Sequence, residues 1–156
     1  MAVNIEEEYD KIYRYCYFRL HGRELAEDIT QETFLRYFAS YHHTDSLSML
    51  KCLYTIARNL CIDEYRRAGK GETEYPGGQT YTASVEEQAL TSLAVRAALS
   101  KMDEEEQELL LLRYVNEVPL AVIGRLYGIS RFAVYRKLLA VTGKFKEELR
   151  KEGEFE

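Results

Sequence analysis

The sequence predicts an all-α protein with two small helical domains, a flexible linker between them, and a helix-turn-helix in the C-terminal domain. Only two of its 156 residues are Pro, the strongest breaker of helix interiors. Apolar residues recur at helical spacing on both sides of residues 69–85, which contain four Gly and one Pro and show no periodicity. We therefore expect domains at residues 1–68 and 86–156, joined by a linker at residues 69–85.

The N-terminal domain is expected to consist of three helices, at residues 5–20, 23–40 and about 46–67. Gly22 is expected to end the first helix as its C-terminal cap, and Asp45 or Ser46 to cap the start of the third. The second helix is expected to bury a side formed by Ala26, Ile29, Thr33 and Tyr37, with Phe34, Phe38 and Tyr41 beside it.

The C-terminal domain is expected to begin with helices at residues 85–101 and 104–115. Asp103 precedes the second of these helices, and Glu106 follows it by three residues, which is the spacing of a capping box. The acidic run at the start of this helix is therefore interpreted as helix-start chemistry rather than as a binding site.

The segment PLAVIGRLYGISRFAVYRKLLAV predicts a helix-turn-helix. Pro119 is expected to be the first helical residue, Gly124 the small helix contact, Gly128 the turn, and Ser130 the cap of a last helix. That last helix is expected to bury Val134, Leu138, Val141 and Phe145, and to turn Arg131, Phe132, Tyr135, Arg136 and Leu139 outward.

Charge is distributed unevenly along the chain. The formal net charge is −5, which argues against a protein that coats nucleic acid through bulk charge. Residues 118–146 nevertheless contain six Lys and Arg residues and no acid. A cluster of cations on a recognition helix is what contacts to DNA phosphates require, so this segment predicts DNA binding.

Several other classes of protein are disfavoured. The first ten residues carry four acids where a secretory signal is basic and then apolar, and no apolar run approaches the length of a membrane span, so a cytoplasmic protein without membrane insertion is expected. Cys16, Cys52 and Cys61 form no metal-ligand or disulfide pattern and are expected to be inert thiols. No catalytic constellation, metal site or cofactor site is predicted, and His42 and His43 are interpreted as loop residues.

The segments DITQETFLRYFASY, LYTIARNLCIDEYRR and LLLLRYV, followed by the GIS turn, resemble the extracytoplasmic-function (ECF) group of bacterial RNA polymerase sigma factors. The resemblance extends from about Tyr9 to Leu149. It implies a protein that binds core RNA polymerase and directs promoter-specific initiation of transcription, and that is not itself an enzyme. It also implies promoter DNA as a partner, together with an anti-sigma factor that covers the polymerase-binding surfaces.

The resemblance assigns roles to three sets of residues. An acidic face with one exposed apolar residue is expected to dock on the polymerase clamp helices, and it comprises Asp28, Gln31, Glu32 and Leu35. The residues expected to bind the opened minus-ten element are Lys51, Thr55, Arg58, Asn59, Ile62 and Arg66, with Tyr41, His42 and Asp45 as candidates for a pocket that captures an unstacked base. The residues expected to bind the minus-thirty-five duplex are Ser130, Arg131, Phe132, Tyr135 and Arg136, in a domain that also touches the polymerase flap.

The sequence departs from the family pattern at several positions. A Trp is usual where Lys51 and Cys52 stand, so packing or melting is expected to differ there. Pro119 and Val122 replace a polar cap and a Glu, which is expected to expose an apolar side chain at Val122. Two other functions stay open at this point: a helix-turn-helix regulator that acts without core polymerase and uses its first domain as a sensor or dimer module, and a protein-interaction adaptor whose DNA surfaces are vestigial.

Overall fold

The computed structural model describes residues 4–43, 45–67 and 93–153, which form helices and no strand. The helices are α1 (Ile5–Leu20), α2 (Arg23–Ser40), α3 (Ser46–Arg67), α5 (Leu93–Ser100), α6 (Glu104–Leu110), η2 (Leu111–Val115), α7 (Leu120–Tyr127) and α8 (Arg131–Gly153). They belong to two compact units, one with α1–α3 and the other with α5, α6, η2, α8 and α7 through Gly124. The all-α prediction is confirmed, and the predicted linker lies outside the described residues.

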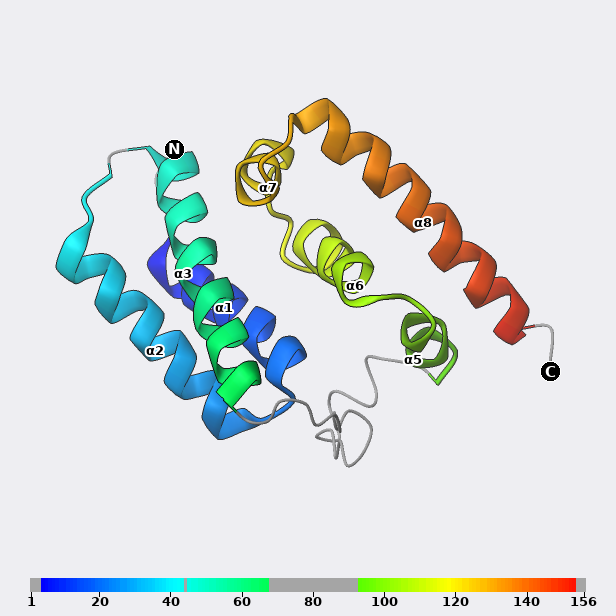
Figure 1. The fold of residues 1–156 in the computed structure, drawn as a ribbon, viewed down its shortest axis with the longest axis horizontal. Coiled ribbons are helices and arrows are strands. Elements are labelled where there is room, and N and C mark those ends of the chain that lie inside the picture. Colours follow the sequence, from blue (N-terminus) through cyan, green and yellow to red (C-terminus); the bar gives the residue numbers. More distant parts are fainter. Residues whose placement is uncertain (1–3, 44, 68–92, 154–156) are drawn as a thin grey trace. The chain divides into compact units, whose positions relative to one another are not determined.

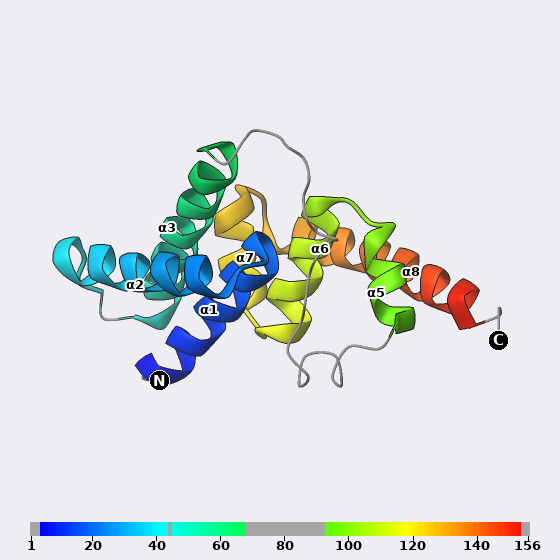
Figure 2. The ribbon, with the colours of Figure 1, turned by 90° about the horizontal axis from the view of Figure 1, so that it is seen from below.

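The first unit is a bundle in which α1, α2 and α3 all contact one another (Figures 1 and 2). Aromatic side chains meet in its core: the rings of Tyr15 in α1 and Tyr54 in α3 lie edge to face, with centroids 5.7 Å apart. Cys16 and Cys61 are also buried in this core, and the hydrogen bond from Cys61 lowers the pKa of Cys16. The core therefore fixes α2 and α3, which carry the predicted polymerase and minus-ten residues.

The junction between α1 and α2 differs from the prediction. His21, and not Gly22, is the C-terminal cap of α1, with a left-handed backbone at φ 59° and an N–H that donates to the Tyr17 carbonyl at 2.7 Å. Gly22 is extended, with φ −145°, and precedes α2 as its N-terminal cap. The prediction placed the cap one residue too late because Gly is the residue that most often adopts the left-handed conformation.

Helix α2 buries polar groups as well as apolar ones. The hydroxyls of Thr30 and Thr33 are fully buried and donate to the carbonyls of Ala26 and Ile29, each at 2.7 Å. Because each hydroxyl donates its hydrogen bond to a carbonyl of the same helix, both side chains pack in the core without an unpaired donor. The predicted burial of Ala26, Ile29, Thr33, Phe34 and Tyr37 is confirmed, whereas Phe38 and Tyr41 are exposed.

In the second unit, α6 begins with the predicted capping box. The Asp103 carboxylate accepts from the Glu106 amide at 2.8 Å, and the Glu106 carboxylate accepts from the Asp103 amide at 2.9 Å. The helix predicted to reach Val115 changes character after Leu110, because η2 is a π-helix in which Asn116 donates to the Leu111 carbonyl. The long helix α8 packs against both α5 and α6, as Figure 2 shows.

A helix-turn-helix is formed by α7, a turn at Gly128 and α8. Gly128 has φ 71°, a left-handed conformation that favours glycine. At Gly124, an added Cβ would lie only 2.7 Å from the Ile129 carbonyl oxygen, so the predicted need for a small residue there is confirmed. The Ser130 hydroxyl accepts from the Ala133 amide at 3.1 Å, which confirms the predicted cap of α8.

Two predictions near the start of α7 are wrong. Pro119 is not the first helical residue but precedes the helix, with an extended backbone at ψ 147° and a carbonyl that accepts from the Val122 amide. Val122 is not exposed but fully buried, as is Val118 four residues earlier. Val118, which precedes the helix, and Val122, in the first turn of α7, thus both belong to the core of the domain.

Candidate nucleic-acid interface

The outward side of α2 carries the acidic face predicted to dock on polymerase. Asp28, Gln31 and Leu35 are all exposed, and 66% of the Leu35 surface is accessible to solvent. Glu32 is partly buried, and its carboxylate lies 2.7 Å from the Arg36 guanidinium one turn later. The charge that this face offers therefore comes mainly from Asp28, because Arg36 offsets that of Glu32.

Phe38 extends this face, and the sequence prediction missed it by placing the ring beside the buried side of α2. It follows Leu35 by three residues and is 58% exposed. Three residues correspond to nearly one helical turn, so the two apolar side chains are neighbours on the surface of α2. The three-residue spacing from Leu35 is the feature of the sequence that indicates an outward position for Phe38.

The predicted minus-ten residues share the outward side of α3. Lys51, Asn59 and Arg66 are exposed there, and the remaining members, Thr55, Arg58 and Ile62, are partly buried. The Thr55 hydroxyl donates to the Lys51 carbonyl at 2.7 Å, which fixes the side chain on its own helix. A mixture of cations and polar groups on one helical stripe suits contacts to a sugar-phosphate backbone.

Three aromatic rings stack in the loop that joins α2 and α3. The Tyr41 and His43 rings lie 6.0 Å apart at an angle of 13°, and Tyr37 stacks on both of them. The Tyr37 hydroxyl and His43 Nδ1 are hydrogen-bonded at 3.0 Å. His43 therefore belongs to the cluster, whereas the prediction named the neighbouring His42; both histidines are exposed.

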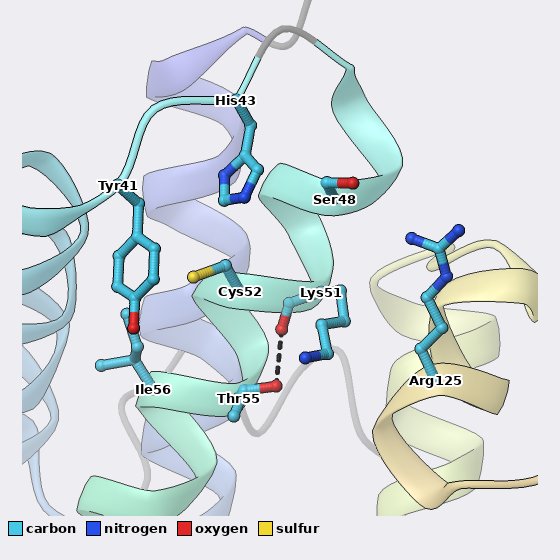
Figure 3. A pocket seen from close by; sticks show the side chains of 8 residues that line it. All are labelled: Tyr41, His43, Ser48, Lys51, Cys52, Thr55, Ile56 and Arg125. Carbon is cyan, nitrogen blue, oxygen red and sulfur yellow. Dashed lines mark hydrogen bonds between the residues drawn. The ribbon is translucent and has the colours of Figure 1, made fainter.

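A hollow opens between this loop and the first turns of α3 (Figure 3). Tyr41 and His43 line it from the loop, and Lys51, Cys52 and Thr55 line it from α3. Aromatic faces beside a cation match what an unstacked nucleobase and its phosphate require. Asp45, the third pocket candidate, instead caps α3, and its hydrogen bond from the Ser48 amide at 2.9 Å holds the pKa of its carboxyl below the usual range.

All of the predicted minus-thirty-five residues lie at the start of α8 and are exposed. Phe132 and Tyr135 are 66% and 53% exposed, and the Arg131 guanidinium lies 5.8 Å from the centre of the Phe132 ring. Leu139, one further turn along α8, is 58% exposed. Large apolar side chains thus share the outward side of this helix with arginines.

Two of the six cations predicted to face DNA are paired within the protein. Lys137 lies 3.6 Å from the Glu105 carboxylate, and Lys144 lies 3.0 Å from that of Glu106. Both acids belong to α6, so the absence of acids from residues 118–146 did not predict their presence beside α8. The charge that α8 offers to phosphates is therefore smaller than the sequence count indicates.

Comparison with known families gives two matches in chain order. Residues 5–71 match the family model described as Sigma-70 region 2, and residues 98–138 match that described as Sigma-70, region 4. The first match covers α1–α3, and the second begins in α5 and ends within α8.

Three curated proteins are similar over most of this chain. The ECF RNA polymerase sigma factor BldN of Streptomyces coelicolor is 30% identical over an alignment of 138 residues that covers 80% of this chain and 51% of BldN. The ECF RNA polymerase sigma factor SigW of Bacillus subtilis is 28% identical over 90% of this chain and 84% of SigW. The RNA polymerase sigma factor YlaC of Bacillus subtilis is 29% identical over 95% of this chain and 91% of YlaC. The chain thus spans about half the length of BldN and most of the other two.

A helix-turn-helix whose second helix is exposed and carries arginines is typical of proteins that bind DNA in transcription. The two matched regions and the similar proteins make the assignment narrower. The chain belongs to the sigma-70 family, within its ECF group of RNA polymerase sigma factors. None of the helices within the described ranges is long and apolar enough to cross a membrane.

Proposed function

We propose that this chain binds core RNA polymerase and directs it to begin transcription at specific promoters. In this proposal, residues 1–68 contact the polymerase and the minus-ten element, residues 69–85 link the domains, and residues 86–156 contact the minus-thirty-five element. The observation that supports it best is the presence of both sigma-70 regions in one chain, in order, each carrying exposed side chains of the required chemistry.

On α2, we assign contact with the polymerase clamp helices to Asp28, Gln31, Glu32 and Leu35, and we add Phe38. Two neighbouring exposed apolar side chains beside a carboxylate fit a protein interface, because burying them is favourable and the carboxylate adds specificity. Glu32 contributes less in this assignment because it is already paired with Arg36.

Contact with the minus-ten element is assigned to α3 and the hollow beside it. The residues of α3 are Lys51, Thr55, Arg58, Asn59, Ile62 and Arg66. In the hollow, Tyr41 and His43 form the surface on which an extruded base stacks, which offsets part of the cost of unstacking it. Cys52 lines the hollow beside that surface. Burial raises the pKa of its thiol, so the side chain that faces the base is small and uncharged.

Contact with the minus-thirty-five duplex is assigned to Ser130, Arg131, Phe132, Tyr135 and Arg136. The second helix of a helix-turn-helix lies in the major groove, with its N-terminal residues at the base edges. These five residues surround the start of α8, so they occupy that position.

Three further properties belong to the same proposal. The chain has no catalytic activity of its own, and the polymerase performs the chemistry. It acts in the cytoplasm, where the polymerase and the promoters are. An anti-sigma factor that covers its polymerase-binding faces controls it.

The test is reconstitution of the full chain with purified core polymerase. We expect the two to elute together, and we expect the complex to select a two-part sequence from a random duplex library. The chain alone is expected to bind duplex weakly. Failure to bind core, with strong selection of duplex by the chain alone, would instead support a regulator that acts without polymerase.

A further inference from the structure

Three apolar side chains form a stripe along the exposed side of α8: Phe132, Tyr135 and Leu139. Each has more than half of its surface accessible to solvent. At 3.6 residues per turn, the three lie within an arc of about 60° around the helix axis. The residues that anchor α8 in the domain, Val134 and Leu138, are buried, so the stripe is separate from the domain core.

An arginine stands on each side of this stripe. On the same helical geometry, Arg131 lies about 40° beyond Tyr135, and Arg136 lies about 40° beyond Phe132 in the other direction. Both arginines are exposed. An apolar strip between two rows of positive charge complements a duplex groove, in which the base edges lie between two rows of phosphates.

Within the major groove, the apolar feature of a base pair is the C5-methyl group of thymine. Neither Phe132 nor Leu139 carries a hydrogen-bonding side chain, so neither can read the donors and acceptors of a guanine or adenine edge. Phe132 and Leu139 are seven residues apart, which is about 10 Å along a helix, or about three steps of base pairs at 3.4 Å each.

We propose that the stripe of Phe132, Tyr135 and Leu139 reads thymine methyl groups in the minus-thirty-five element. The element that this protein prefers then contains thymines at two or three nearby positions, and Arg131 and Arg136 hold the flanking phosphates or an adjacent guanine. This inference rests on the proposed function, and it adds the chemical class of sequence that the recognition helix selects.

The first experiment uses the full chain bound to core polymerase and a promoter library that is randomised upstream. We expect thymine to be enriched at two or three positions within about three base steps. Leu139→Ala and Phe132→Ala should each abolish the enrichment at one position. Leu93→Ala is the matched control, because Leu93 in α5 is 78% exposed in the same domain but lies off the recognition helix. Selection of a promoter without thymine enrichment overturns this inference and leaves the proposed function intact, whereas no selection at all counts against both.

The second experiment changes only the DNA, so it does not depend on how a protein variant folds. Replacing an enriched thymine by deoxyuridine removes the methyl group and keeps every hydrogen-bonding atom. Burial of one such group corresponds to about fourfold in affinity, so we expect about fourfold weaker binding for each replacement. The loss should disappear with the Phe132→Ala or Leu139→Ala protein that faces the replaced base. Equal affinity for thymine and deoxyuridine DNA overturns the inference, and it would leave the stripe as a surface for a protein partner.

Discussion

The ammonium group of Lys137 in α8 lies 3.6 Å from the carboxylate of Glu105 in α6. A second pair joins the same two helices, because Lys144, seven residues further along α8, contacts Glu106, whose carboxylate also closes the capping box with Asp103. The recognition helix is thus held by the acidic start of α6, which withdraws two of its cations from DNA. Under the proposed function, a protein built in this way depends more on polymerase to deliver it to a promoter.

Neutralising Glu105 is predicted to release Lys137 toward DNA. For Glu105→Gln we expect tighter binding of duplex by the full chain and a salt dependence steeper by about one phosphate contact, with a slope change near 0.9. Glu104→Gln removes the same charge from the preceding residue and serves as the control. Affinity against salt concentration, measured by fluorescence anisotropy, checks this. If the two variants gave the same slope, the pair would not limit phosphate contact.

The left-handed backbone of His21 predicts that glycine is favoured at position 21 and is not needed at position 22 to end α1. His21→Gly is expected to raise the free energy of unfolding by about 1 kcal/mol, because it removes the strain of a Cβ in that conformation. Gly22→Ala is expected to cost no more than about 1 kcal/mol, the usual cost of alanine at a helix N-terminal cap, since Gly22 is extended and an added Cβ meets nothing closer than 3.9 Å. Urea unfolding of both variants measures this. Marked destabilisation by Gly22→Ala would put the cap at Gly22 after all.

His21 also predicts a dependence of stability on pH. Burial lowers the pKa of His21, so the folded state favours the neutral ring. An unfolded histidine titrates near pH 6.5, so the unfolded state takes up the proton first as the pH falls, and stability decreases below about pH 6.5. His21→Asn should therefore lose less stability than the wild type between pH 7 and pH 5, as measured by urea midpoints. His42→Asn, at an exposed loop position, should behave as the wild type; identical pH profiles for all three proteins would contradict the assignment.

Two glycines in the C-terminal domain are predicted to respond in opposite ways to alanine. Gly124→Ala should destabilise the protein by about 1–3 kcal/mol, because its Cβ meets the Ile129 carbonyl and must push α7 away from the turn. Gly143 lies in α8 with nothing within 4 Å of an added Cβ, so Gly143→Ala should stabilise the helix by about 1 kcal/mol. Thermal unfolding followed by circular dichroism checks both. Equal effects of the two substitutions would mean that the turn does not need a small residue.

The helices and their caps were largely predictable from the sequence because they depend on local patterns. Apolar periodicity placed α1–α3, and the Asp103 and Glu106 spacing placed the start of α6. Two wrong predictions, at Gly22 and Pro119, misplace a helix end by one residue, and others concern contacts that local patterns do not encode. Burial of Val122 depends on which neighbours its helix meets, whereas the exposure of Phe38 was indicated locally by its spacing from Leu35. The pairing of Lys137 with Glu105 joins residues 32 positions apart in the chain, so a count of charges along one segment could not anticipate it.

In the candidate site, too, the residues on periodic helices were predictable and the contacts in the loop were not. The exposed residues of α2, α3 and α8 were predicted because their spacing places them opposite buried stripes. His43 was missed because a loop has no periodicity to indicate which of two adjacent histidines joins the aromatic cluster. Only the three-dimensional stacking with Tyr37 and Tyr41 distinguishes it from His42.

Promoter-directed transcription with purified core polymerase tests the central claim most directly. The measurement is the amount of transcript with a defined start site, made from DNA selected by the reconstituted complex, with and without the chain. We predict transcript only when the chain is present, and a loss of at least tenfold with Asp28→Ala combined with Gln31→Ala at limiting concentration, equivalent to about 1.4 kcal/mol. Asp10→Ala, at an exposed position of α1, should retain full activity. Equal transcript without the chain, or none from any selected DNA with it, would contradict the claim that this protein is an initiation factor.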